Sequence, residues 1–153
     1  VQKALKEYDK DMFNLVYVEL PGDDSAVYSG VENALAANPD TVGIICDGGS
    51  SGHTASYVLE DLGIGNNKGD KPIYLADHDV FEGSLVQIEE GWMTACVSQD
   101  PVNQTYLSFK MLHDFYTTYD TSVFKDVSLD FIVVDEKAAP DWLKIIADGG
   151  MVG

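Results

Sequence analysis

The chain has little positive charge and no long apolar run, and each shortage excludes a class of protein. It carries nine Lys and Arg residues against 26 Asp and Glu residues, which gives a formal net charge of −17. Because nucleic-acid binding needs clustered Lys and Arg, this balance excludes a nucleic-acid partner and disfavours docking on an anionic membrane. No stretch of 18 or more apolar residues occurs, so the sequence contains no candidate membrane-spanning helix.

Cysteines are also scarce. Only Cys46 and Cys96 occur, without a C-x-x-C pair, which is too few for a disulfide scaffold. Both lie at the ends of apolar runs, so we expect small buried side chains. The length of 153 residues and the hydrophobic fraction of 45% suit a single domain with its own core. The chain starts at Val1 inside a helix-like run, without a signal peptide, and we expect it to be part of a longer protein.

Helical and strand patterns alternate along the whole chain. Strands are expected at 13–18, 41–46, 73–76, 92–97 and 129–134, and helices at 1–8, 26–37, 54–62, 80–90, 106–119 and 142–147. The 41–46 run is apolar throughout, which predicts a strand that is buried on both faces. The alternation predicts an α/β fold with three α/β/α layers and a mostly parallel open sheet, which forms one lobe over residues 1–153.

Hydrogen-bonding side chains gather directly after the predicted strands. They are Glu19, Asp23 and Asp24 after the first, Asp47 to Ser51 after the second, Asp77, His78 and Asp79 after the third, and Ser98, Gln99 and Asp100 after the fourth. Parallel sheets bind ligands at the carboxyl ends of their strands, so these residues predict a binding edge. The edge has almost no positive charge, which disfavours an anionic ligand. A neutral polyhydroxylated ligand fits better, because its hydroxyls donate to carboxylates.

The residues give no support for catalysis. The string Gly-Gly-Ser-Ser-Gly at 48–52 is neither a Gly-x-Ser-x-Gly nucleophile elbow nor a phosphate-binding loop. We expect His53 to be a polar residue that faces solvent, while His78 is the best candidate for a titrating group. The sequence therefore predicts a protein that is not an enzyme and that has no cofactor and no resident metal.

Two segments resemble type I periplasmic binding proteins. The string NALAANPD at 33–40, followed by VGII at 42–45, is similar to a helix end and the next strand of that family. The string IEEGWMTACVSQDP at 88–101 resembles the family segment I-x-x-G-x-(I/L)-x-A-(T/S)-V-x-Q-x-P. The resemblance covers residues 1–135 and places them in the C-terminal lobe of a ribose-binding-protein-like fold.

The resemblance also implies which residues bind the ligand. By position, Asp77 is the carboxylate that accepts from sugar hydroxyls, and Gln99 is the amide that completes the pocket. Asp79 takes the place of Asp77 if the register shifts by two residues. The family's Asn-Asp-x-x-Ala string is absent, and Gly48 stands where the family has the asparagine. The implied ligand-binding set is Asp77, Gln99, Asp47, Gly48, Ser50 and Asp79.

The resemblance further implies an extracytoplasmic sugar-binding protein that serves a transporter permease or a membrane sensor kinase. Such a protein is periplasmic, extracellular or a cell-surface lipoprotein. An N-terminal lobe would be the missing partner of this chain, so we expect weak ligand binding by this lobe alone. Two alternatives stay open. One is the effector domain of a LacI-type regulator, and the other is a flavodoxin-like or receiver-like domain that binds Mg²⁺ through Asp47, Asp77 and Asp79.

Overall fold

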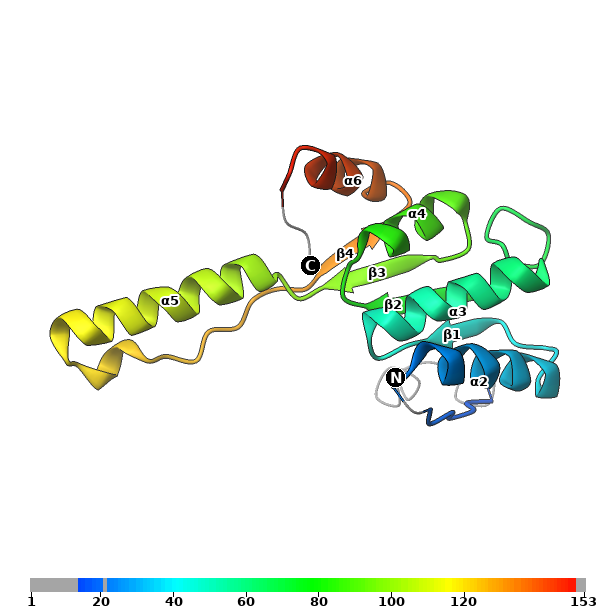
Figure 1. Ribbon diagram of the computed structural model, residues 1–153, viewed down its shortest axis with the longest axis horizontal. Helices are drawn as coiled ribbons and strands as arrows, with labels where there is room; N and C mark the ends of the chain where they lie inside the picture. The colour runs from blue at the N-terminus through cyan, green and yellow to red at the C-terminus, as the bar shows by residue number, and fades with distance from the viewer. Residues whose placement is uncertain (1–13, 21, 151–153) are drawn as a thin grey trace.

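The computed structural model describes residues 14–20 and 22–150, and it contains one four-stranded sheet with its helices (Figure 1). The elements in chain order are α2 (Asp24–Ala37), β1 (Gly43–Ile45), α3 (Gly49–Leu62), β2 (Tyr74–His78), α4 (Glu82–Glu90), β3 (Ala95–Ser98), α5 (Pro101–Thr118), the short 3₁₀ helix η1 (Thr121–Val123), β4 (Ile132–Asp135) and α6 (Ala139–Ala147). The predicted helix at 1–8 lies outside the described residues. The predicted α/β fold with a mostly parallel open sheet is confirmed.

The strands lie in the order β1-β2-β3-β4. β1, β2 and β3 are parallel, whereas β4 runs antiparallel to β3, so the sheet is mixed. The carboxyl ends of the three parallel strands therefore meet at one edge. α5 follows β3 directly and leaves the lobe from this same edge (Figure 1).

The core lies between the sheet and a single layer of helices. α3 and α4 contact the sheet, α2 packs on α3, and α6 packs on α4. Leu75, Cys96 and Val134 point from three adjacent strands into this layer, where they meet Leu59 and Leu85, and all five are fully buried. Burying one such aliphatic side chain contributes about 2 kcal/mol to stability.

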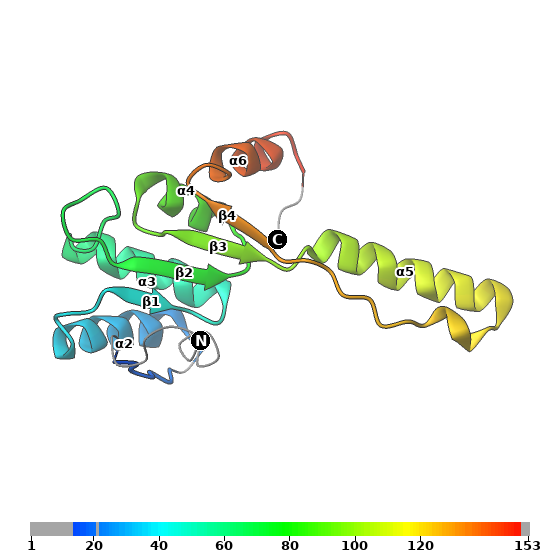
Figure 2. The same ribbon diagram turned by 180° about the vertical axis from the view of Figure 1, so that it is seen from behind.

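The opposite face of the sheet is open in the part of the chain that is described. Figure 2 shows the strands in front, with the helices behind them. Ile45, Tyr74 and Val133 are exposed on the lobe surface, and Ile45 retains 65% of its accessible area. β1 therefore is not buried on both faces as its apolar run predicted, because no described helix covers this face of the sheet. The described residues do not supply a second helical layer.

The strand predicted at 13–18 is wrong for its described residues. Residues 14–18 have no regular secondary structure, and Leu15, Val16 and Val18 are exposed. A strand forms only where a neighbour satisfies its backbone hydrogen bonds. In the described chain no strand pairs with this segment, although its β-branched and aromatic composition favours one.

The predicted helices are found, but several boundaries shift. α2 begins two residues early because the Asp23 carboxylate accepts from the Ala26 amide at 2.9 Å and caps the helix. α3 begins at Gly49, so the glycine-rich turn is itself the first helical turn, and it ends at Gly63 with a φ of 65°. β2 continues through His78, so Asp77 lies inside a strand rather than after it.

α5 forms an arm that extends away from the rest of the lobe, and residues 124–131 return along it (Figure 1). No residue of this 18-residue helix is buried. Its inner side contacts the returning segment, where the Phe115 and Phe124 ring centroids lie 5.3 Å apart. Its outer side carries exposed apolar residues, which are Val102, Tyr106, Phe109, Leu112 and Tyr116. We call these five residues the α5 stripe.

Candidate functional site

Asp79 and Gln99 meet at the carboxyl edge of the sheet. The Gln99 side-chain amide donates to the Asp79 carboxylate at 2.7 Å, although the two residues are 20 positions apart in the chain. Asp79 has a φ of 76°, a left-handed conformation that is uncommon outside glycine, and its amide donates to the Val97 carbonyl at 2.9 Å. Two neighbouring strands thus hold a carboxylate and an amide side by side, both partly exposed.

The segment after β3 is fixed by its own hydrogen bonds. The Gln104 side chain donates to the Gln99 carbonyl at 2.6 Å, and the Asp100 carboxylate caps α5 through the Asn103 amide. Asp100 also has a left-handed φ of 56°. These contacts orient Gln99 at the point where the chain leaves the sheet for the α5 arm.

Asp77 lies below this edge rather than on it. It is 3% exposed and points toward the helix layer, where its carboxylate packs against Gly52 of α3. One carboxylate oxygen accepts from the His78 amide at 2.7 Å, and the other has no partner among the described residues. The expected contact between Asp77 and a sugar hydroxyl therefore does not fit this geometry, because the side chain faces the interior.

The start of α3 forms the next part of the edge. Asp47 and Ser50 are exposed, and the Gly48 carbonyl accepts from the Ser51 hydroxyl at 2.6 Å. Gly48 is the N-cap and makes no side-chain cap, so the first amides of α3 face outward without a capping side chain. Asp47 and Ser50 are placed where they can contact a ligand above the edge.

Phe81 is a residue that sequence reasoning missed. It precedes α4, is about half exposed, and lies so close to Gly49 that an added Cβ there would collide with its ring. An aromatic ring beside the polar edge could stack on the C–H face of a sugar. The sequence showed little sign of this role, because Phe81 lies at the start of α4 and not among the polar residues directly after a strand.

The electrostatics of the edge are acidic. The pKa of Asp77 is raised to about 7, mainly by burial; the His78 amide opposes this shift, and the nearby Asp79 and Asp47 charges add to it. Burial, assisted by the Asp77 charge, likewise raises the pKa of Cys46 to about 11. In the described part of the chain no group of three His, Cys, Asp or Glu residues could hold a metal ion.

His53 was predicted to face solvent, but the structure places it differently. Its ring is partly buried against Tyr57 at 4.7 Å, its Nε2 atom has no partner among the described residues, and burial lowers its pKa. It borders a groove of about 540 Å³ between α2 and α3, lined also by Asp24, Tyr28 and Asp61. This groove includes neither residue of the Asp79 and Gln99 pair, so it is separate from the edge.

Comparison with known families decides the class of the chain. The family described as "Periplasmic binding protein domain" matches residues 1–117. The chain belongs to the periplasmic binding protein family. The matched residues include β1, β2 and β3, which carry the acidic and amide edge. No curated protein matches the chain.

Solved periplasmic binding proteins share the fold at low sequence identity. A solute-binding protein of an ABC transporter from Agrobacterium vitis, bound with α-D-tagatopyranose, matches with a TM-score of 0.79 and 16% identity over 99% of this chain and 49% of its own length. A periplasmic ribose ABC transporter protein from Conexibacter woesei matches with a TM-score of 0.71 and 18% identity over 94% of this chain and 47% of its own length.

A glucose-galactose binding protein from Geobacillus stearothermophilus matches with a TM-score of 0.64 and 18% identity over 78% of this chain and 40% of its own length. The chain thus spans less than half the length of these periplasmic binding proteins. Among residues 14–20 and 22–150, no helix has the length and apolar character needed to cross a membrane.

Proposed function

We propose that the chain is the sugar-binding lobe of an extracytoplasmic solute-binding protein, and that its ligand is a sugar or a similar polyhydroxylated molecule. The hydrogen bond between Asp79 and Gln99 at the carboxyl edge of the sheet carries this proposal. A carboxylate can accept from two sugar hydroxyls, and an amide can both donate and accept. The absence of Lys and Arg from the edge residues disfavours an anionic ligand.

The geometry divides the predicted ligand set into two groups. Asp79 and Gln99 take the direct role, because both are partly exposed and lie together. Asp47 and Ser50 would add contacts from the start of α3, and Phe81 would supply the stacking ring. The proposal therefore gives Asp79 the role that the sequence resemblance implied for Asp77.

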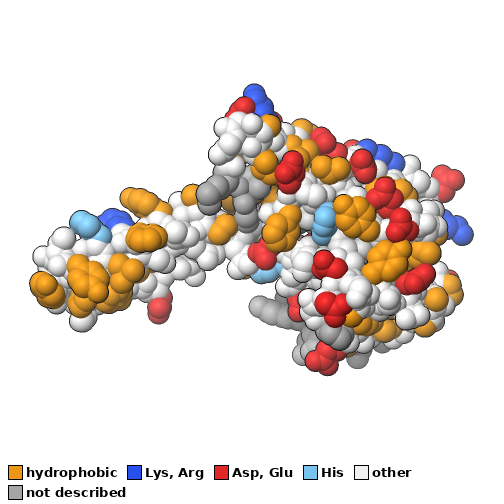
Figure 3. Space-filling model, in the orientation of Figure 1, with side chains coloured by type: hydrophobic (Ala, Val, Ile, Leu, Met, Phe, Trp, Pro, Cys, Tyr) orange, Lys and Arg blue, Asp and Glu red, His pale blue; other side chains and the backbone are white. Residues whose placement is uncertain are grey.

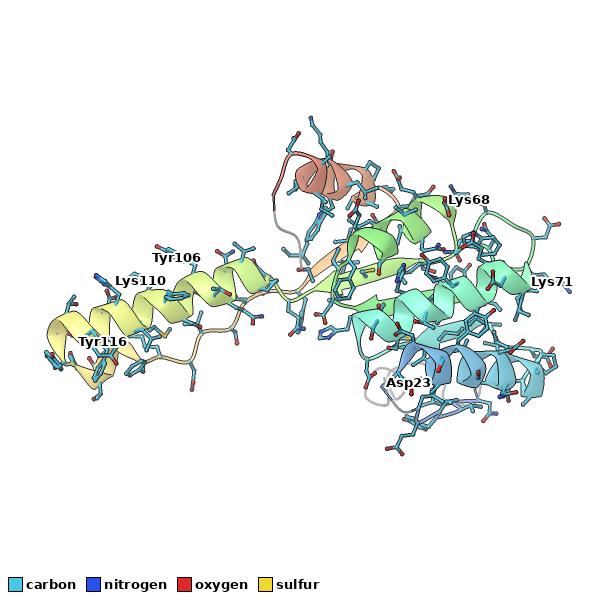
Figure 4. All side chains as sticks on the ribbon, in the orientation of Figure 1. Asp23, Lys68, Lys71, Tyr106, Lys110 and Tyr116 are labelled. Atoms are coloured by element: carbon cyan, nitrogen blue, oxygen red, sulfur yellow. The ribbon has the colours of Figure 1, made fainter. Side chains whose placement is uncertain are left out.

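The edge would be half of a pocket, closed by a second lobe that this chain does not contain. The α5 arm supports this arrangement. Its stripe is exposed to solvent, with Phe109 at 70%, and Figures 3 and 4 show apolar side chains along the arm, with Tyr106 and Tyr116 labelled. A row of large exposed side chains on one helix marks an interaction surface. We propose that the α5 stripe packs on the second lobe. This contact would hold the second lobe next to the carboxyl edge of the sheet.

The proposed site binds a ligand and does not transform it. The Asp79 carboxylate accepts from the Gln99 amide, and this pairing of an acceptor with a donor suits the binding of sugar hydroxyls. Such a protein would work outside the cytoplasm, where it would present its sugar to a transporter permease or a membrane sensor. The acidic surface, with a net charge of −17, suits a protein that must stay soluble there.

A thermal-shift screen of the full two-lobed protein tests this function. D-ribose, D-arabinose, D-allose and myo-inositol are the probes, and we expect at least one to raise the Tm in the presence of EDTA. Asp79→Ala and Gln99→Ala should remove the shift, whereas the control Asp70→Ala should keep it, because Asp70 lies in an exposed loop at the opposite end of β2. Stabilisation by divalent metal alone would contradict the proposal.

A further inference from the structure

Asp77 is an interior carboxyl group that the proposed sugar contacts do not use. It lies among the apolar residues between β2 and α3, with one oxygen bonded to the His78 amide and the other without a partner among the described residues. Desolvation of an unpaired carboxylate is costly, whereas a protonated carboxyl group carries no charge. The surroundings therefore favour the protonated form.

The space for this side chain is made by a glycine. A Cβ added to Gly52 would collide with the Asp77 side chain, including its carboxyl group. The absence of a side chain at Gly52 thus lets the first turns of α3 approach β2 over a carboxyl group. The Asp77 carboxyl group thus lies directly against α3, with 3% of the residue exposed.

Two carboxylates act on Asp77 from neighbouring parts of the chain. The Asp47 charge acts from the end of β1 and the Asp79 charge from the loop after β2. The thiols of Cys46 and Cys96 lie on the adjacent strands, and the Asp77 charge contributes to raising the pKa of each. Among the described residues, no positive side chain contributes to the Asp77 environment. An ionised Asp77 would therefore face two carboxylates, and the His78 amide is the group that opposes their effect.

We propose that Asp77 is protonated in the folded lobe and acts as a positioning residue. Its neutral carboxyl group keeps the end of β2 in place, and this in turn keeps Asp79 beside Gln99. Loss of that proton would place a charge under the edge and loosen it. The hydrogen bond from the His78 amide connects the carboxyl group directly to the backbone that leads into Asp79. What the edge binds rests on the proposed function, but the proton switch itself does not.

The sign of the pH dependence follows from the raised pKa. The folded lobe keeps the Asp77 proton up to a pKa of about 7, whereas the unfolded chain releases it near 3.8. Between these values only the folded state holds the proton, so stability falls as the pH rises, and the loss is complete above about pH 7. This is opposite to the behaviour of a carboxylate that is stabilised by an ion pair.

Urea unfolding of the chain between pH 4 and pH 9 tests the switch, with Asp77→Asn as the uncharged variant of the same shape. Relative to Asp77→Asn, the unfolding constant of the unsubstituted chain should rise by roughly tenfold per pH unit, about 1,000-fold in all between pKa values of 3.8 and about 7. Asp70→Asn, which removes an exposed charge, should follow the unsubstituted chain. Parallel profiles for the unsubstituted chain and Asp77→Asn would overturn the proposal.

Two further measurements keep the proposal testable if Asp77→Asn does not fold. The ¹³C carboxyl signal of Asp77 in the unsubstituted chain should titrate near pH 7, and a midpoint near 3.8 would overturn the proposal. Amide hydrogen exchange, corrected for intrinsic rates, should accelerate at residues 76–80 above pH 7, and unchanged protection would overturn the positioning role. Neither measurement needs a sugar, so failure of sugar binding is distinguishable from failure of the switch.

Discussion

The helix-covered side of the lobe and the α5 arm both carry large apolar side chains but differ in what covers them. In the lobe, Leu59 and Leu85 are fully buried against the sheet. On the arm, Phe109 and Tyr116 remain mostly exposed, and no residue of α5 is buried. Helices are stabilised mainly by packing of their apolar face, so the described residues provide this stabilisation for the lobe helices but not for the α5 stripe.

This difference teaches which parts of the chain carry their own stability. The lobe side should unfold cooperatively, with its energy in the core between sheet and helices. The arm should contribute little to that transition, because its main described contacts are with η1 and the returning segment. Substitutions on the two sides therefore separate the stability of the lobe from the proposed docking of a second lobe.

The largest expected effect is on the lobe side. Leu59→Ala removes a fully buried side chain from the contact between α3 and the sheet and leaves a cavity. We expect a loss of about 3 kcal/mol in the free energy of unfolding, measured by urea denaturation. A loss below about 1 kcal/mol would show that the core between sheet and helices does not dominate stability.

A smaller effect is expected at the end of α3. Gly63 has a φ of 65°, and an added Cβ there would have nothing within 4 Å, so Gly63→Ala changes backbone strain without a clash. We expect a loss of about 1 kcal/mol in the free energy of unfolding, because alanine is disfavoured in the left-handed region. An unchanged urea midpoint would contradict the assigned cap.

The smallest effect on folding is expected on the arm. Phe109→Ser replaces the most exposed ring of the α5 stripe, and its free energy of unfolding should change by less than about 0.5 kcal/mol. The same substitution should reduce self-association of the isolated chain in analytical ultracentrifugation, since it interrupts the exposed apolar surface. If Phe109→Ser destabilised the chain as much as Leu59→Ala, the distinction between lobe and arm would be wrong.

Much of the fold could be predicted because its signals are local. The helix patterns, the asparagine and proline that end α2, and the glycines after α3 and α4 located these elements within a few residues. The segment 14–18 was misassigned because a strand depends on a neighbour, which a local pattern cannot reveal. The exposure of α5 was likewise hidden, since its apolar pattern predicts a buried face but does not identify what covers it.

The candidate site was predicted in part. The family-like segment at 88–101 contains Gln99 and so pointed directly to one half of the pair. Asp77 was favoured over Asp79 because the family resemblance implied, by position, an aspartate directly after the strand predicted at 73–76. Here β2 continues through a buried acid that Gly52 accommodates, a contact between residues far apart in the chain. The folded geometry favours the alternative register, in which Asp79 takes the direct role in the proposed site.

The most direct test of sugar binding at the edge is a ¹H–¹⁵N NMR titration of this chain with D-ribose, D-arabinose, D-allose and myo-inositol. Half a pocket binds weakly, but chemical shifts detect millimolar affinity. We predict that at least one of these ligands shifts the signals of Asp79, Gln99 and Phe81 while leaving Tyr28 and Tyr57 in the α2–α3 groove unchanged. Shifts confined to that groove, or none at Asp79 and Gln99 with any of the four, would contradict the account.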